Sequence, residues 1–388
     1  IRDSGQVNQE SSAYDHYTPQ IDPAGNTLQL TNDNETEAAS WFATSQVSVS
    51  NFTASFDYQA TGSLGNLADG LAFILQDSSA GLSALGGDGG ELGYGPDGNS
   101  QQRGGTAISP SAAVELNLYN VGPTPGTNFA TNGSTGSYNG TGSVDFWDTG
   151  HAVQVVLSYS GSNETLSETL TDLVTGATYS TTYYNVDLAS ILGSNTAYVG
   201  FSAGDGGGAS TQIVSNFTFE DGPITTGSYT VATGAGLEFD SPVANSVTVS
   251  FAGSTGTLQL DQPASFAADI AGIAGTGDVL DLKGFDWADT TATTGPGSYN
   301  GTTTALTVFD SSDDATVTLT LLGDYSGSSW TVTNDGSGGA DIVDPPAKTS
   351  GLSVSAEDDT FIFHPGTGAQ TVANFNPKLD TIELDNFN

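Results

Sequence analysis

The 388-residue chain carries 44 acidic residues against five basic ones, a formal net charge of −39, and it contains no cysteine. This balance excludes the clustered basic surface that nucleic acids and anionic membranes require, so we expect no nucleic-acid partner. Without cysteine there is no disulfide and no thiolate chemistry, and no apolar run is long enough for membrane insertion as a helix.

The composition predicts an all-β fold. Gly, Ser, Thr, Asn and Asp are abundant, and Val, Thr, Tyr and Phe recur in short alternating runs that are typical of strands. The length predicts about two or three domains. Such acidity is best tolerated in salty media or with bound Ca²⁺, which favours an extracellular or cell-surface location.

Residues 1–221 form the first predicted domain. Gly-rich or Asn/Asp-rich turns separate its strands, which is the pattern of a β-sandwich or closed barrel. The predicted strands are Thr27–Leu30, Ser48–Tyr58, Gly70–Gln76, Ala112–Tyr119, His151–Ser160, Leu166–Asp172, Ala197–Ala203 and Gln212–Phe219.

Asp69 lies in a turn directly before the apolar strand that begins at Gly70. A fixed carboxylate at a loop tip can accept two hydrogen bonds from sugar hydroxyls. The alternative is a turn aspartate that bonds only to its own backbone.

The next candidate is a glycine-rich loop over residues 85–95, which includes Gly89 and Gly90. Glycines let backbone N–H groups approach a ligand closely. The loop lacks the lysine and the strand–loop–helix context of a phosphate loop, so nucleotide binding is poorly supported. The alternative is a flexible connection.

Polar side chains alternate along the strand that follows. Glu115 and Asn117 share one face of it, and Asn120 comes at its end. A hard cation such as Ca²⁺ prefers these oxygens, and an asparagine held by the metal can donate its amide to a sugar hydroxyl. The alternative is a polar row that faces solvent on an edge strand.

Together, in this order and spacing, the three motifs resemble the L-type (legume) lectin family over about residues 1–220. The runs at 28–31, 39–42, 198–204 and 213–219 add to the resemblance. It implies a legume-lectin-like jelly-roll sandwich that binds glycans.

The resemblance also implies roles for individual residues. Asp69 matches the aspartate that binds the monosaccharide, and Gly89 or Gly90 matches the backbone donor of the second loop. Asn120 resembles the asparagine of the third loop. The fourth, specificity-setting loop falls at 204–208, with Gly204, Asp205 and Gly206. Glu115 and Asn117 lie where the family places a Glu and an Asp that ligate Mn²⁺ and Ca²⁺.

The sequence departs from the family at the metal site. Asn117 replaces an aspartate, which removes a ligand charge and weakens Ca²⁺ binding. Asn120 comes one residue earlier than in plant lectins, and Gly122-Pro123-Thr124-Pro125 stands where the family has further Asp and His ligands. We therefore expect a weakened Ca²⁺ site at Glu115, Asn117 and Asn120, without the transition metal.

The pattern does not favour an enzyme. A retaining jelly-roll glucanase needs two carboxylates about 5–5.5 Å apart, and on this strand they would read Glu-x-Asp-x-x-Glu. The corresponding residues are Glu115, Asn117 and Asn120, so the acid/base pair is missing. The three histidines are far apart and lack zinc-hydrolase spacing.

Residues 222–346 predict a second β-rich module, either a β-solenoid or a small β-sandwich. This stretch resembles repeat modules of bacterial adhesins. Residues 347–388, after the linker at 344–346, resemble the flanking segments of repeats-in-toxin proteins, although the calcium-binding nonapeptide is absent.

The leading hypothesis is a non-catalytic, calcium-assisted lectin or adhesin of a bacterial surface, exported by type I secretion, with glycans or polysaccharide as partners. Because the chain begins at Ile1, we expect a processed product or a fragment. The second hypothesis is a structural subunit that self-associates into an extracellular fibre or matrix. A jelly-roll glycoside hydrolase is third.

Overall fold

The computed structural model describes residues 6–9, 18–22, 26–63, 65–97, 105–119, 125–147, 149–274, 277–295 and 297–344, and four short strands between 352 and 384. The chain divides into two compact units, residues 1–224 and 225–388. The fold is all-β, as the sequence predicts. Among the described residues the only α-helix is the five-residue α1 (Leu188–Leu192), and no helix there is long and apolar enough to cross a membrane.

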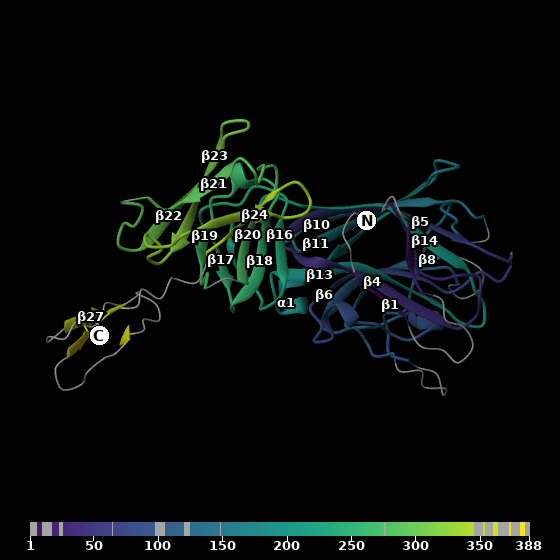
Figure 1. The fold of residues 1–388 in the computed structure, drawn as a ribbon. Coiled ribbons are helices and arrows are strands. Elements are labelled where there is room, and N and C mark those ends of the chain that lie inside the picture. The colour runs from purple at the N-terminus through teal and green to yellow at the C-terminus, as the bar shows by residue number, and fades with distance from the viewer. Residues whose placement is uncertain are drawn as a thin grey trace. The chain divides into compact units, whose positions relative to one another are not determined.

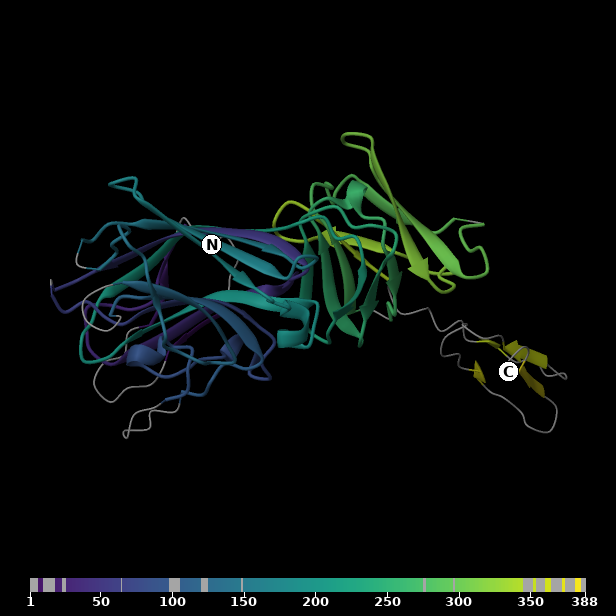
Figure 2. The same ribbon diagram turned by 180° about the vertical axis from the view of Figure 1, so that it is seen from behind.

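Unit 1 is a sandwich of two antiparallel sheets, seen as two facing layers in Figures 1 and 2. In order, the strands of the first sheet are β1 (Gln6–Gln9), β4 (Glu37–Ser48), β13 (Thr196–Asp205), β6 (Gly70–Gln76), β7 (Ser111–Asn117), β8 (Gly126–Thr131) and β9 (Asn139–Gly140). Those of the second are β12 (Thr178–Tyr184), β11 (Thr165–Asp172), β10 (Val153–Ser160), β5 (Asn51–Thr61), β14 (Thr211–Asp221), β3 (Thr27–Gln29) and β2 (Gln20–Ile21).

The sandwich core follows the period-two alternation of the strands. In β5 every second side chain from Phe52 to Ala60 is buried, because only one face of the second sheet meets the first. Phe56 of β5 packs against Phe73 of β6 and Phe201 of β13, with ring centroids 5.9 and 4.9 Å away. These aromatic contacts join the two sheets.

The first sheet is buried on both faces. Its outer face carries a second apolar cluster, in which Phe42 and Ile74 pack with Tyr94 and Ile108 of the segment between β6 and β7. That segment contains the short 3₁₀ turns η1 (Gly81–Ser83) and η2 (Gly89–Glu91). Alternate residues of β4, β6, β7 and β13 therefore face either the sandwich or this covering loop.

Unit 2 begins as a coil of parallel strands. β15 (Gly227–Val231), β17 (Val247–Phe251) and β19 (Asp269–Ala271) pair in one sheet, and β16 (Gly236–Phe239), β18 (Thr255–Leu260) and β20 (Gly277–Leu282) pair in another. Successive strands alternate between the sheets, which is the geometry of a β-solenoid rather than of a small sandwich. In Figure 2 the teal-green to green strands of residues 227–282 form this coil, and lighter green marks the strands that follow it.

Antiparallel strands follow the coil. β21 (Thr290–Thr293), β22 (Thr303–Asp310) and β23 (Ala315–Leu322) extend the first sheet of unit 2, and β24 (Thr331–Asn334) and β25 (Ala340–Val343) extend the second. The 3₁₀ turn η3 (Pro263–Ser265) precedes β19. Towards the C-terminus, β26 (Leu352–Ser353) pairs with β28 (Val372–Ala373), and β27 (Thr360–Phe363) pairs with β29 (Thr381–Leu384).

Glu168 is a carboxylic acid that is enclosed in the sandwich of unit 1. Glu168 of β11 is fully buried and accepts hydrogen bonds from the Thr127 hydroxyl at 2.7 Å and the Tyr183 hydroxyl at 2.8 Å. Burial raises the pKa of Glu168 from 4.5 to about 7, and the two hydroxyls only partly oppose this effect. Folding therefore favours its protonated form.

The substitution Glu168→Gln tests this buried acid. Because the pKa of Glu168 is higher in the folded protein than in the unfolded chain, the free energy of unfolding of the wild type falls as the pH rises from 4.5 through about 7. The variant has no group that titrates at this position, so its free energy of unfolding does not fall in this way. Relative to wild type, we expect the variant to gain about 2–3 kcal/mol between about pH 5 and about pH 8. Denaturant unfolding at both pH values measures the gain, and the exposed Glu220→Gln is the control. An equal pH response of variant and wild type would contradict the assignment.

Candidate functional site

Asp69 lies immediately before β6, at one end of the first sheet. Its N–H donates to the Gly204 carbonyl at 3.0 Å, and its own carbonyl accepts from the Leu118 N–H at 2.8 Å. The peptide bond between Ala68 and Asp69 is cis. The main chain of Asp69 is therefore held from both sides, by β13 and by the residue after β7.

Three loops converge on the Asp69 carboxylate. A Cβ placed on Gly206 would lie 2.8 Å from Asp69 Oδ2 and 3.1 Å from the Gly89 Cα. A Cβ on Gly204 would lie 2.7 Å from the Gly89 carbonyl oxygen. Gly89 itself has a φ of +62°, a conformation that favours glycine. The structure thus brings Asp69, Gly89, Gly204 and Gly206 to one place, which we call the rim.

The environment of Asp69 makes it a weaker acid than usual. Burial raises its pKa from 3.8 to about 6; the Gly206 backbone hydrogen bond lowers it, and the charge of Asp88 raises it. Above about pH 6 the carboxylate is ionised and is an acceptor for hydroxyl donors.

Two hydrogen bonds from residues distant in the sequence hold the loop of Asp69. The Trp147 indole N–H donates to the Leu67 carbonyl at 3.0 Å, and the Ser210 hydroxyl donates to the Ala68 carbonyl at 2.8 Å. Sequence reasoning missed both supports, because each joins residues at least 80 positions apart and neither has a motif. They fix the loop before a ligand arrives.

Three further residues were predicted to contact the sugar: Gly90, Asp205 and Asn120. Gly90 is exposed beside Gly89. Asp205 follows Gly204 in β13, but its side chain is fully buried and turned into the sandwich. Asn120 lies outside the described residues.

Glu115 and Asn117 of β7 face the covering loop, on the outer face of the first sheet. They are 0% and 4% exposed, and neither oxygen of Glu115 nor Oδ1 of Asn117 makes a hydrogen bond of standard geometry within the described residues. Burial raises the pKa of Glu115 to about 8; the neighbouring Tyr138 and Asn128 side chains lower it and the charge of Glu91 raises it.

A family model, the legume lectin domain, matches residues 19–228, more than half of the chain. The chain belongs to the legume lectin family. The sandwich of unit 1 is the legume-lectin-like fold that the sequence predicts.

Solved legume lectins resemble this chain at low identity. The lectin from Bauhinia forficata in complex with GalNAc is 17% identical over 56% of this chain and 93% of that one, with a TM-score of 0.44. Lectin II from Ulex europaeus is 19% identical over 55% and 91%, with a TM-score of 0.43. Lectin I-B4 from Griffonia simplicifolia, in a metal-free form, is 22% identical over 57% and 94%, with a TM-score of 0.43.

The family implies metals at Glu115 and Asn117. Their buried oxygens make no hydrogen bond of standard geometry within the described residues, and they are hard donors of the kind that Ca²⁺ prefers. The described residues contain no group of three or more His, Cys, Asp or Glu that could hold a metal. The third predicted ligand, Asn120, lies outside the described part of the chain.

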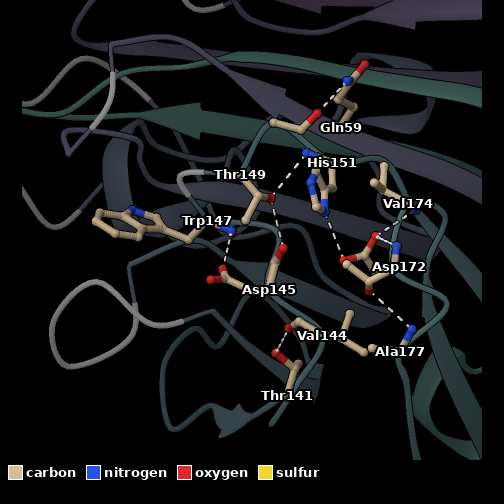
Figure 3. Close-up of polar contacts among 12 residues, drawn as sticks. Gln59, Thr141, Val144, Asp145, Trp147, Thr149, His151, Asp172, Val174 and Ala177 are labelled. Atoms are coloured by element: carbon tan, nitrogen blue, oxygen red, sulfur yellow. Dashed lines mark hydrogen bonds and ion pairs between the residues drawn. The ribbon is translucent and has the colours of Figure 1, made fainter.

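His151 pairs with Asp172 (Figure 3). Its Nδ1 lies 2.9 Å from Asp172 Oδ2, while Asp172 Oδ1 accepts from the N–H groups of Val174 and Thr175 at 2.8 and 3.1 Å. Burial raises the pKa of Asp172, but these hydrogen bonds outweigh it and hold the pKa well below its usual range. The pair closes the turn between β11 and β12.

Gly206→Ala tests whether the rim is the ligand site. The added Cβ would press on Asp69 Oδ2 and on the Gly89 backbone, whereas a Cβ on Gly207 meets no atom within 4 Å. We expect Gly206→Ala to weaken binding on a glycan array about tenfold or more, and Gly207→Ala to leave it unchanged. Equal binding by the two variants would place the ligand elsewhere. Thermal melts of both variants show whether each is folded.

Proposed function

We propose that unit 1 is a non-catalytic carbohydrate-binding module that takes a saccharide at the rim. The observation that carries this proposal is the convergence of the Asp69 carboxylate with the Gly89 and Gly206 backbones. Membership of the legume lectin family supports it.

The chemistry of binding follows from the rim's donors and acceptors. Ionised Asp69 accepts hydrogen bonds from two sugar hydroxyls, and the exposed Gly90 N–H donates one. We propose that Asn120 adds an amide donor, and that the backbone of residues 204–206 forms the remaining side of the saccharide site. Shallow sites of this kind bind single sugars weakly, so several copies on one surface would supply the avidity.

We propose that a bound Ca²⁺ ion assists saccharide binding at the rim. When bound, Ca²⁺ at Glu115, Asn117 and Asn120 would supply positive charge and hold the loop of Asn120 in place. The chain's own residues perform the recognition: Asp69 accepts and Gly90 donates.

Asp69→Asn should abolish glycan binding, because the amide keeps the shape and removes the charged acceptor. Since the pKa of Asp69 is raised to about 6, wild-type affinity should also fall as the pH drops through about 6, well above the 3.8 of an ordinary aspartate. Affinity for the best array glycan, measured from about pH 4.5 to about pH 8, checks both. Undiminished affinity at about pH 5 would contradict the role of the ionised carboxylate.

The calcium dependence has its own test. EDTA should weaken binding to the array and added Ca²⁺ should restore it. Mn²⁺ should add nothing further, because Gly122-Pro123-Thr124-Pro125 supplies neither Asp nor His. Glu115→Gln should reproduce the EDTA effect without chelator, with the exposed Glu220→Gln as control. If Glu115→Gln binds glycan as wild type does in Ca²⁺, the cation has no role at this position.

We propose that the protein acts outside the cell as a surface lectin or adhesin. The solenoid module at 222–346 would be a spacer that carries the lectin unit, and 347–388 would be a terminal segment of a bacterial type I secretion substrate. The chain's acidity supports an extracellular setting.

One observation favours the alternative of a fibre or matrix subunit. β12 is the edge strand of the second sheet of unit 1, and its last residue, Tyr184, is 71% exposed. An exposed edge can add a strand from another copy. Regular filaments in negative-stain micrographs would support this function, and a monomer at high concentration would oppose it. A jelly-roll hydrolase, the third hypothesis, requires release of reducing sugar.

A further inference from the structure

Two acidic side chains lie next to each other inside the sandwich of unit 1. Glu37 begins β4 and Asp205 ends β13, and the two are directly opposite in the antiparallel register. They are 7% and 0% exposed. Alternation places them on the same face as Trp41 and Ala203, which belong to the sandwich core. Glu115 and Asn117 face the other side of this sheet.

Asp205 is only partly satisfied by its neighbours. Its Oδ1 accepts from the Gln212 side chain at 2.8 Å, and Gln212 in turn accepts from the Tyr58 hydroxyl at 2.8 Å. Its Oδ2 is buried and makes no hydrogen bond of standard geometry among the described residues, although the Ser210 backbone also acts on this carboxyl group and lowers its pKa. A buried carboxylate oxygen in this state costs free energy unless something fills the position.

The loop before β4 lies against Glu37. The Asn32 N–H donates to Glu37 Oε2 at 2.8 Å, which folds the loop against the acid pair. The Asn32 side-chain oxygen Oδ1 is also buried without a partner among the described residues. The same loop reaches the rim, because the Thr36 N–H donates to the Gly206 carbonyl at 3.1 Å.

No Lys, Arg or His of the described part of unit 1 pairs with the Asp205 carboxylate. The only Lys, Arg or His described there is His151, and it is paired with Asp172. Burial, together with the charges of Glu37 and Asp69, raises the pKa of Asp205 well above its usual value, although Gln212 and Ser210 oppose this. A positive charge from solution would relieve this repulsion.

We propose that Glu37, Asp205 and Asn32 hold a hard divalent cation, Ca²⁺, beneath the rim. Two carboxylates and an amide oxygen are the donors that this ion prefers, with water or main-chain oxygens completing its shell. The cation joins β4, β13 and the loop at 32–36, and through Thr36 it fixes Gly206. It is separate from the cation proposed at Glu115, on the opposite face of the sheet.

Calcium binding to the whole chain tests the site without any glycan. We expect isothermal titration with CaCl₂ to count one site fewer in Asp205→Asn than in wild type, because the amide oxygen of the variant can still accept from Gln212 while the charge is gone. Ca²⁺ at about 100 times its Kd should raise the melting temperature of wild-type unit 1 by about 5–10 °C, and by less in the variant.

Further variants keep the result interpretable. Asn32→Ala removes the third oxygen from a half-buried loop residue and should weaken the same site, should Asp205→Asn fail to fold. Glu168→Gln, which changes a buried acid with both oxygens hydrogen-bonded, should keep the full calcium count. Glu115→Gln should lose a different calcium site. The double variant of Glu115→Gln and Asp205→Asn should therefore bind two calcium ions fewer than wild type.

Two outcomes would overturn the proposal. One is an unchanged calcium count and affinity in both Asp205→Asn and Asn32→Ala. The other is a wild-type melting temperature that Ca²⁺ leaves unmoved while Asp205→Asn raises it at neutral pH, which would mean that protons, not a cation, neutralise the pair. Neither result depends on whether the rim binds sugar.

Discussion

The close approach of three backbones around one carboxylate is the constraint on which the proposed saccharide site depends. Gly204 and Gly206 lie so near Gly89 and Asp69 that a single methyl group would overlap their atoms. The two sheets supply the rigid base: Asp69 is bonded to β13 on one side and to Leu118 on the other. The rim is thus shaped before a ligand binds, which limits the entropy that binding costs.

Burial of the first sheet on both faces separates the polar chemistry of unit 1 into two layers. Glu115 and Asn117 face the covering loop, and Glu37 and Asp205 face the sandwich. Asn117 pairs with Gly70, the residue after Asp69, and Asp205 follows Gly204, so both layers reach the rim.

Alternation and turn residues predicted much of the sandwich. All eight predicted strands of the first domain have counterparts, and β6 has the predicted bounds, Gly70–Gln76. The twelve-residue β4 was not predicted as a strand. It is covered on both faces and shows no alternation, and its sequence EAASWFATSQVS lacks the continuous run of large apolar side chains that marks β6. The choice between solenoid and sandwich for unit 2 required strand pairing, since parallel and antiparallel neighbours leave the same period-two signal.

The site was predicted in part for similar physical reasons. Asp69, Gly89, Gly204 and Gly206 meet as the resemblance implies. Position in a loop does not reveal which way a side chain turns, and so Asp205 was grouped with the surface although strand parity points it inward. The contact of Trp147 with Leu67 spans 80 positions, so only the folded chain reveals it.

A crystal structure of the protein soaked with its best-binding saccharide would show where the ligand lies. We expect two sugar hydroxyls within hydrogen-bonding distance of the Asp69 carboxylate and a third near the Gly90 N–H. A saccharide bound away from Asp69, with the three loops unchanged and the rim holding only water, would contradict this expectation.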